Sequence, residues 1–258
     1  MKNLTRLLAI GLLYLPLTAV HAQPGGPGMM GGPSAAGPSL SGGMVKVFGD
    51  HTNFSANLEL TGKDTSANEN VILPGKVAFS SGKSSFAMNL TEAKGTGMPP
   101  DAGEQLKAMG MDRMTMISRP DKKVAYMVYP GMSAYVEMPI QDPDALKPPS
   151  DFKAETTPLG KDTINGIACV KSKMIVTDDK GSKHEYTVWN ATELKDFPMK
   201  IETTQEGKNV TLIFKDVKLS KPAETQFDPP ADCKRFGSMQ AMMQEVMMKR
   251  FGGGPPGP

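Results

Sequence analysis

The stretch RMTMISRPDKKVAYMVYPGMSAYVEMP, residues 113–139, decides the fold of this chain. It holds three short runs that are rich in β-branched, aromatic and methionine side chains: Arg113 to Ser118, Val124 to Tyr129 and Ala134 to Met138. The connections are Arg119-Pro120-Asp121 and Pro130-Gly131, in which proline fixes φ and glycine permits the positive φ of a tight turn. Short strands joined by tight turns pair with their chain neighbours, so this stretch predicts an antiparallel meander.

The same pattern continues on both sides of this stretch. Phe54 to Leu60 alternates apolar and polar residues, which is the period of a strand with one buried face. Further strands are predicted at Lys76 to Ser80, Ser85 to Leu90, Ala168 to Val176, Glu185 to Asn190, Lys200 to Thr204 and Val210 to Leu219. Their turns include Ser81-Gly82, Asp179-Lys180-Gly181 and Glu206-Gly207.

Helix signals are few. They lie at Pro100 to Met109, at Ala191 to Asp196 and at Ser238 to Phe251. A twisted antiparallel sheet with a few short helices on one face is an α+β fold, and such a sheet can curl around a cavity that the helices close.

The two ends of the chain predict its compartment and its domain limits. Lys2 and Arg6 precede an apolar run from Leu7 to Val20, and the small residues Ala19 and Ala22 predict a secretory signal peptide over residues 1–22, cleaved after Ala22. Residues 23–43 are rich in Gly, Pro and Ser and predict a flexible leader. We therefore expect a β domain over residues 44–235, followed by a methionine-rich helix and a Gly/Pro tail over residues 236–258.

The charge balance narrows the possible partners. The chain has 29 Lys and Arg and 27 Asp and Glu, and the only charges in the first 22 residues are Lys2 and Arg6, so the mature chain is formally neutral. Neutrality argues against nucleic acid and against anionic lipid surfaces as electrostatic partners. The apolar run of the signal peptide is too short to span a membrane, so we expect a mature chain without a transmembrane segment, located in the periplasm or secreted.

Four segments resemble a known group of proteins. They are ISRPDKKVAYMVYPGMSAYVEMP (Ile117 to Pro139), PLGKDTINGIACVKSKMIV (Pro158 to Val176), VWNATELKDFPMKIET (Val188 to Thr203) and IFKDVKLSKPAETQFDPP (Ile213 to Pro230). In this order they resemble a family of uncharacterised secreted bacterial domains that is distantly similar to the LolA/LolB lipoprotein carriers. The resemblance implies an incomplete β-barrel closed by helices, with a hydrophobic cavity for acyl chains of a lipid or lipoprotein.

Residues with the spacing to line such a cavity lie in the opening stretch. Side chains at strand spacing on adjacent hairpins could share one inward face: Met114, Met116, Tyr126, Val128, Val136 and Met138. Flexible thioether side chains suit a pocket that accepts variable apolar ligands. The alternative is that these residues only fill a core.

Methionine is unusually frequent, with 20 residues in the chain. A helix over the C-terminal segment would place Met239, Met242 and Met243 on one stripe, with Met247 at its edge. Three interpretations remain open: packing against the sheet, binding of a partner protein or lipid, and binding of a soft metal such as copper.

Cys169 and Cys233 are the only two cysteines. In an oxidising compartment such a pair most often forms a disulfide, which here would stabilise the fold by about 2–4 kcal/mol. The alternative is two buried thiols.

The sequence contains no recognisable nucleophile, zinc or phosphate-binding motif, and only His51 and His184 remain after export. We therefore expect no enzyme, no cofactor and no metal centre. The resemblance favours an exported protein that binds a lipid or an acyl chain between sheet and helices. The alternatives are a non-catalytic envelope scaffold that binds another protein, and a copper-binding protein.

Overall fold

A long antiparallel sheet forms most of the molecule. The computed structural model describes residues 40, 42–64, 69–96, 101–205 and 208–251. Within these residues the sheet has 13 strands. Their bounds are β1 Asn53–Asp64, β2 Glu69–Ser80, β3 Lys83–Asn89, β4 Lys94–Gly95, β5 Arg113–Arg119, β6 Val124–Tyr129, β7 Ala134–Pro139, β8 Lys153–Ile164, β9 Ile167–Thr177, β10 Lys183–Ala191, β11 Phe197–Gln205, β12 Lys208–Lys218 and β13 Lys234–Phe236.

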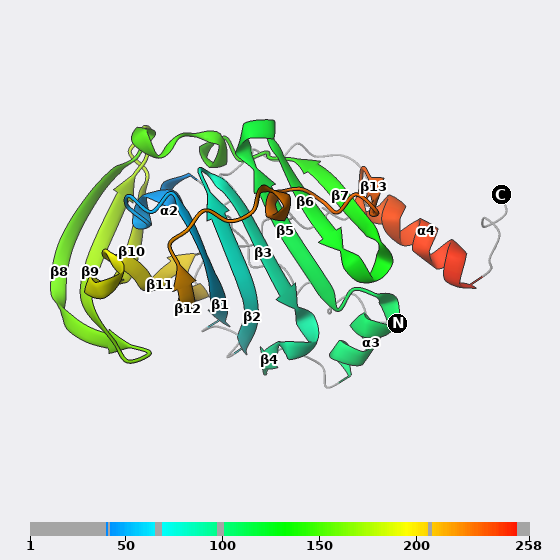
Figure 1. Cartoon of the computed structure of the whole chain (residues 1–258), viewed down its shortest axis with the longest axis horizontal. Helices are drawn as coiled ribbons and strands as arrows, with labels where there is room; N and C mark the ends of the chain where they lie inside the picture. Colours follow the sequence, from blue (N-terminus) through cyan, green and yellow to red (C-terminus); the bar gives the residue numbers. More distant parts are fainter. Residues whose placement is uncertain (1–39, 41, 65–68, 97–100, 206–207, 252–258) are drawn as a thin grey trace, which may run out of the picture.

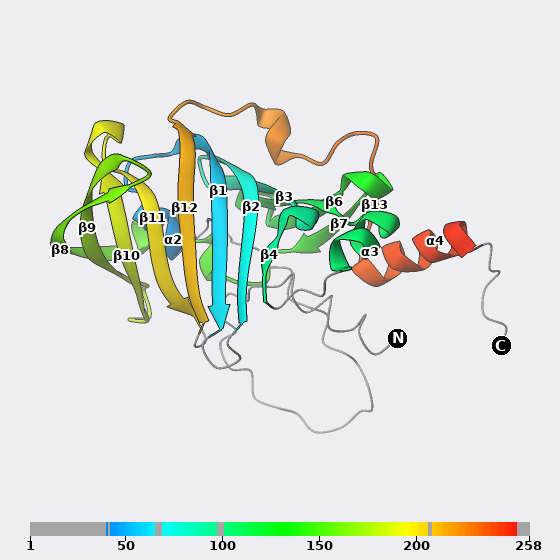
Figure 2. The same cartoon turned by 90° about the horizontal axis from the view of Figure 1, so that it is seen from below.

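The strands follow the order β13-β7-β6-β5-β3-β2-β1-β12-β11-β10-β9-β8, with β4 beside β2. Only the short pairing of β13 with β7 is parallel; the other pairs that the structure describes are antiparallel. The sheet curls along its length, as Figures 1 and 2 show, but its end strands β8 and β13 are at opposite ends of the order and do not close a barrel. The predicted α+β fold with a curved, open antiparallel sheet is confirmed.

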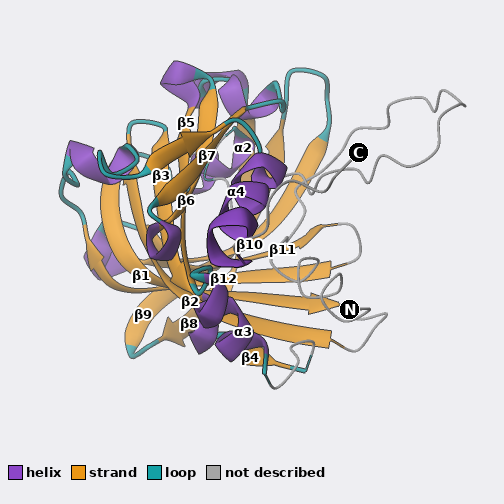
Figure 3. Cartoon of the chain, turned by 90° about the vertical axis from the view of Figure 1, so that its right-hand side faces the viewer, coloured by secondary structure: helices purple, strands orange, loops and turns teal. Residues whose placement is uncertain are grey.

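Three α-helices accompany the sheet in the described part of the chain: α2 Gly43–Val47, α3 Ala102–Met109 and α4 Met239–Phe251. The helices α3 and α4 occupy the predicted segments, and Figure 3 shows both at one end of the curled sheet. The third predicted helix is a short 3-10 turn, η6 Thr192–Leu194. None of the helices in the described residues has the length and apolar character that crossing a membrane requires.

The predicted turns of the opening stretch are 3-10 turns that begin at proline. The turn η2 Pro120–Lys122 joins β5 to β6, and η3 Pro130–Met132 joins β6 to β7. Each is followed by a residue in the left-handed region, Lys123 at φ 57° and Ser133 at φ 46°. Proline presets the first turn residue and the left-handed residue reverses the chain, so the three strands form the expected meander.

One face of the sheet, here called the inner face, packs on the main hydrophobic core. The alternating residues of β1 are all buried there: Phe54, Ala56, Leu58 and Leu60. At the centre, Phe54 stacks on Phe48 at 4.9 Å and on Phe79 at 5.4 Å, and Phe197 meets it edge-on at 5.0 Å. Phe48 follows α2, which lies within the curl of the sheet in Figure 2. The core therefore joins α2 to strands that are far apart in the sequence.

The opposite face of the sheet, here called the outer face, carries a strap formed by residues 219–233. The strap connects β12 to β13 and crosses the strands in Figure 1. Its short turn η7 Glu224–Phe227 places Phe227, which has no exposed surface, in a second hydrophobic cluster with Ala78, Ile117, Tyr126 and Val128. These contacts hold the strap on the sheet.

Arg119 anchors the strap by charge-assisted hydrogen bonds. The guanidinium, 8% exposed as a residue, donates to Asp228 at 2.6 Å and to the Phe227 carbonyl at 3.2 Å. It also donates to both carboxylate oxygens of Asp121, at 2.9 and 2.7 Å, and this hydrogen bonding lowers the pKa of Asp121. A bidentate arginine of this kind fixes geometry as well as charge.

The leader and strand β8 also differ from the sequence prediction. Leu40, placed in the predicted leader 23–43, is buried in the main core, and α2 begins at Gly43, so ordered structure starts before residue 44. Strand β8 was not expected, because its residues up to Thr163 are all exposed and show no apolar alternation. The signal peptide and most of the leader lie outside the described residues.

Candidate functional site

Four of the predicted cavity residues lie on the inner face. Met114 and Val136 are buried in the main core, and Met116 and Met138 are partly buried against it. They come from the adjacent strands β5 and β7, which flank β6. The sheet therefore places these four side chains on one face, where they pack in or against the main core.

Tyr126 and Val128 lie on the outer face, not on the inward face that the strand spacing predicts. Both belong to the cluster beneath the strap, on the outer face. Their neighbours Met127 and Tyr129 point inward instead, and Met127 lies opposite Met116 and Val136. Every residue of VAYMVY is apolar, and because a shift of one residue moves every side chain to the other face, alternation could not decide which set points inward.

The β5–β7 end of the inner face is covered by methionines. We call the following partly buried residues the methionine shell: Met109, Met116, Met132, Met138, Met239 and Met243. They come from α3, β5, η3, β7 and α4, and the contacts α3–η3, β5–η3 and α4–β7 bring these elements together. The same core also holds methionines that are buried, namely Met88, Met111, Met114, Met127 and Met242.

The helix α4 contributes its predicted stripe to this shell. Met242 has no exposed surface, Met239 and Met243 pack on the main core, and Met248 on another side of the helix is 50% exposed. The side chain of Met247 lies outside the described residues. The stripe thus docks on the sheet through contacts with β7 and β13.

The predicted disulfide between Cys169 and Cys233 is wrong for this structure, because both cysteines are free. Cys169 is buried on β9, near one end of the strand order, whereas Cys233 precedes β13 at the other end. An oxidising compartment and an even number of cysteines favour a disulfide. A disulfide, however, needs Cα atoms within about 7 Å of each other, and these two cysteines lie near opposite ends of the strand order. Burial raises the pKa of both thiols.

We predict that the purified mature chain carries two thiols and that a reducing agent leaves its melting temperature unchanged. Cys169 is 3% exposed, so it should react with a thiol reagent only after unfolding, whereas Cys233, partly exposed, should react slowly in the folded chain. Thiol titration and intact mass measure this. A mass lower by two hydrogen atoms, together with destabilisation on reduction, would show a bridge instead.

The structure also gathers Asp144, Asp178 and Asp179 within 4.8 Å, a spacing compatible with a cation. The ammonium of Lys147 already contacts this cluster, at 2.7 Å from Asp144 and in an ion pair with Asp179. Hydrogen bonding to Lys147 lowers the pKa of Asp179. Asp178 accepts the backbone N–H groups of Lys180 and Ser182, as expected for an aspartate in a turn.

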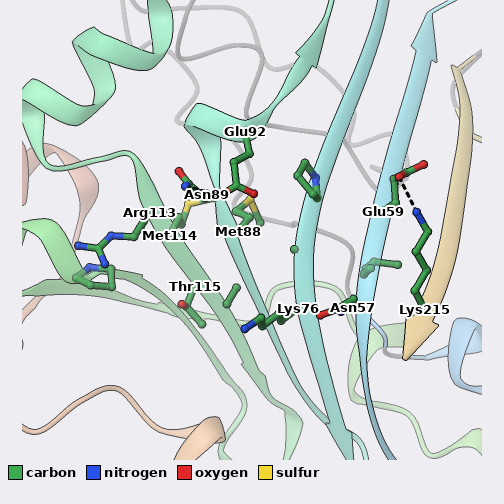
Figure 4. Close-up of a pocket in the computed structure, with 15 residues that line it drawn as sticks. Asn57, Glu59, Lys76, Met88, Asn89, Glu92, Arg113, Met114, Thr115 and Lys215 are labelled. Atoms are coloured by element: carbon green, nitrogen blue, oxygen red, sulfur yellow. Dashed lines mark hydrogen bonds and ion pairs between the residues drawn. The ribbon is translucent and has the colours of Figure 1, made fainter. Parts of the chain in front are cut away.

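A pocket of about 580 Å³ lies on the outer face, across β12, β1, β2, β3 and β5. Figure 4 shows its polar side chains. Its lining residues are Asn57, Leu58, Glu59, Pro74, Gly75, Lys76, Ala87, Met88, Asn89, Glu92, Arg113, Met114, Thr115, Pro130 and Lys215. We call it the outer pocket. No pattern in the sequence indicates this pocket, because the polar residues of an alternating strand are also typical of a plain solvent-facing surface.

The acidic groups of the outer pocket have close partners. Glu59 pairs with Lys215 at 3.1 Å, and Glu92 accepts a hydrogen bond from Asn89 at 2.8 Å. Asn57 donates to Asp216 at 2.6 Å. Most of the carboxylates and amides around the pocket are therefore already engaged in an ion pair or a hydrogen bond.

Comparisons with known proteins find likeness in structure alone. No protein-family model and no curated protein matches the chain. LprF from Mycobacterium bovis is 16% identical, with a TM-score of 0.39, over 75% of this chain and 99% of its own. The lipoprotein LppX from Mycobacterium tuberculosis is 9% identical, with a TM-score of 0.39, over 71% and 96%. A LolA superfamily protein from Nitrosomonas europaea is 10% identical, with a TM-score of 0.35, over 71% and 93%.

Proposed function

We propose that this chain is an exported, non-catalytic carrier that holds an acyl chain of a lipid or lipoprotein against the methionine shell, between β5–β7 and the helices α3 and α4. The observation that carries this proposal is the shell itself. Six methionines from five elements converge on one end of the inner face, and each is only partly buried. An accessible patch of flexible thioethers can adapt to apolar ligands of different shapes.

The compartment that the sequence predicts also supports this proposal. The predicted signal peptide over residues 1–22 would deliver the chain to the cell envelope, where acyl chains must cross an aqueous space. Transfer of an acyl chain from water to an apolar surface is favourable by about 0.8 kcal/mol per buried CH₂. A carrier that supplies such a surface therefore needs no catalytic group.

Native mass spectrometry with lipid extraction tests the proposal on residues 23–258 purified from the periplasm without detergent. We expect near-stoichiometric acyl lipid to accompany the chain. In the double variant Met116→Gln, Met138→Gln, polar amides replace two thioethers of the shell, so fatty-acid binding should weaken roughly tenfold or more. The matched control is Met248→Gln, because Met248 is exposed and lies outside the shell.

An apo mass combined with no uptake of fluorescent fatty acid would contradict the carrier. That outcome would favour the second candidate, a scaffold that binds another protein, for which the edge strand β8 is the specific observation. Its residues Lys153 to Thr163 are all exposed, including Leu159 at 54%. An open edge can pair with an extended segment of a partner.

A further inference from the structure

The outer pocket has two cations that form no ion pair with the acids of its own lining. Its lining holds Lys76, Arg113 and Lys215 against Glu59 and Glu92. Lys215 is engaged by Glu59. Arg113 has one long ion pair, in which its Nε lies 3.8 Å from Asp112, and that pair leaves the rest of the guanidinium without a close acceptor among the described residues.

Lys76 and Thr115 extend this set of donors. The described residues offer no hydrogen-bond or ion-pair partner to either side chain. Figure 4 shows Arg113 on one side of the pocket, Glu59 with Lys215 on the other, and Lys76 and Thr115 between them. The ammonium, the guanidinium and the hydroxyl that line this pocket are donors that a phosphate or carboxylate group can bind.

Apart from Asn57 and Asn89, whose amides bond to Asp216 and Glu92, the rest of the lining is apolar or lacks a side chain. Pro74, Gly75, Ala87 and Pro130 contribute to the pocket, together with the buried residues of the strands below. Position 75 requires glycine, because a Cβ there would lie 2.6 Å from the carbonyl oxygen of Ala87. At about 580 Å³, the outer pocket falls within the range of roughly 300–1,000 Å³ for small-molecule sites, and a bare inorganic ion would leave this apolar surface uncovered.

We propose that the outer pocket is a second binding site, for an organic anion whose phosphate or carboxylate contacts Lys76 and Arg113 while its apolar body lies over Pro74 and Ala87. The site is separate from the proposed carrier function, because it lies on the opposite face of the sheet from the methionine shell. The anion is either a free small molecule or the head group of a lipid.

The test is a titration of the isotope-labelled mature chain, followed by amide NMR. Phenyl phosphate represents a free organic anion, and vesicles of phosphatidylcholine with phosphatidic acid represent a lipid head group. Benzyl alcohol and inorganic phosphate are the probes that lack the charge or the apolar body. We expect phenyl phosphate or the acidic vesicles to perturb the amides of Gly75, Ala87 and Thr115, with binding that weakens as salt is added.

The variant Lys76→Gln, Arg113→Gln should weaken this binding at least tenfold. The control Lys153→Gln, Lys161→Gln removes the same charge from the exposed strand β8 and should change binding by less than twofold. Benzyl alcohol and inorganic phosphate should each bind at least tenfold more weakly than phenyl phosphate.

The proposal would be overturned by no binding of either anionic probe, by equal binding of the Lys76→Gln, Arg113→Gln variant, or by perturbations confined to Met116 and Met138. Inorganic phosphate that binds as tightly as phenyl phosphate would also overturn it, since the apolar body would then contribute nothing. The variant Met116→Gln, Met138→Gln should keep phenyl phosphate binding, so failure of the carrier and failure of the outer pocket remain distinguishable.

Discussion

Replacing Phe54 with alanine is expected to lower the free energy of unfolding by about 3–5 kcal/mol. Phe54 has no exposed surface, and its ring contacts Phe48, Phe79, Phe197 and Phe214 at centroid distances of 4.9 to 6.2 Å. Removing the ring leaves a cavity whose walls come from Phe48, just after α2, and from the strands β2, β11 and β12, and these walls cannot all move inward together. The cost should therefore approach the upper part of the range.

Urea denaturation followed by the fluorescence of Trp189 measures this change, and the melting temperature should fall by roughly 10 °C. The control is Phe54→Leu, which keeps most of the volume and should cost less than half as much. A loss below about 1 kcal/mol for the alanine variant would mean that the phenylalanine cluster is not the centre of the core.

The second large effect is expected for Phe227→Ala, at about 3 kcal/mol or more. Phe227 is the only phenylalanine of the described strap, and its ring is buried against Ile117, Tyr126 and Val128 beneath the ammonium of Lys83 at 5.3 Å. Without this ring the strap keeps Arg119 and its carboxylates but loses its apolar anchor. We expect the strap to open locally before the sheet unfolds.

Limited proteolysis at residues 219–233, combined with urea denaturation, measures this opening. The strap of Phe227→Ala should be cleaved at least tenfold faster than that of the unaltered chain. Lys221→Ala is the control within the strap, because the ion pair of Lys221 with Glu224 is exposed and should contribute less than about 1 kcal/mol. Equal cleavage of both variants would show that the ring does not hold the strap.

The sequence by itself determined the local elements. Alternation in β1 identified both the strand and its inward residues, because a strand with one buried face must repeat every second residue. Proline at Pro120 and Pro130 located the turns, since it presets φ whatever the rest of the fold does. The methionine stripe of α4 was also visible, because residues spaced three and four apart share one side of a helix.

The tertiary structure alone decided which face of β6 points inward. Its residues are apolar on both faces because the strap, which begins more than 80 positions later, covers the outer one. The strand β8 could not be predicted because it lies at the edge of the sheet with both faces exposed, so its residues show no apolar alternation. Pairing with β9 holds it in place.

The same reason explains why the two proposed binding surfaces could not be predicted from the sequence. The distance between Cys169 and Cys233, the convergence of the methionine shell and the grouping of Lys76 with Arg113 all depend on which strands become neighbours in the sheet. Local periodicity reports how each segment is buried, whereas strand order depends on pairing between segments that are distant in the chain, and no single segment carries that information.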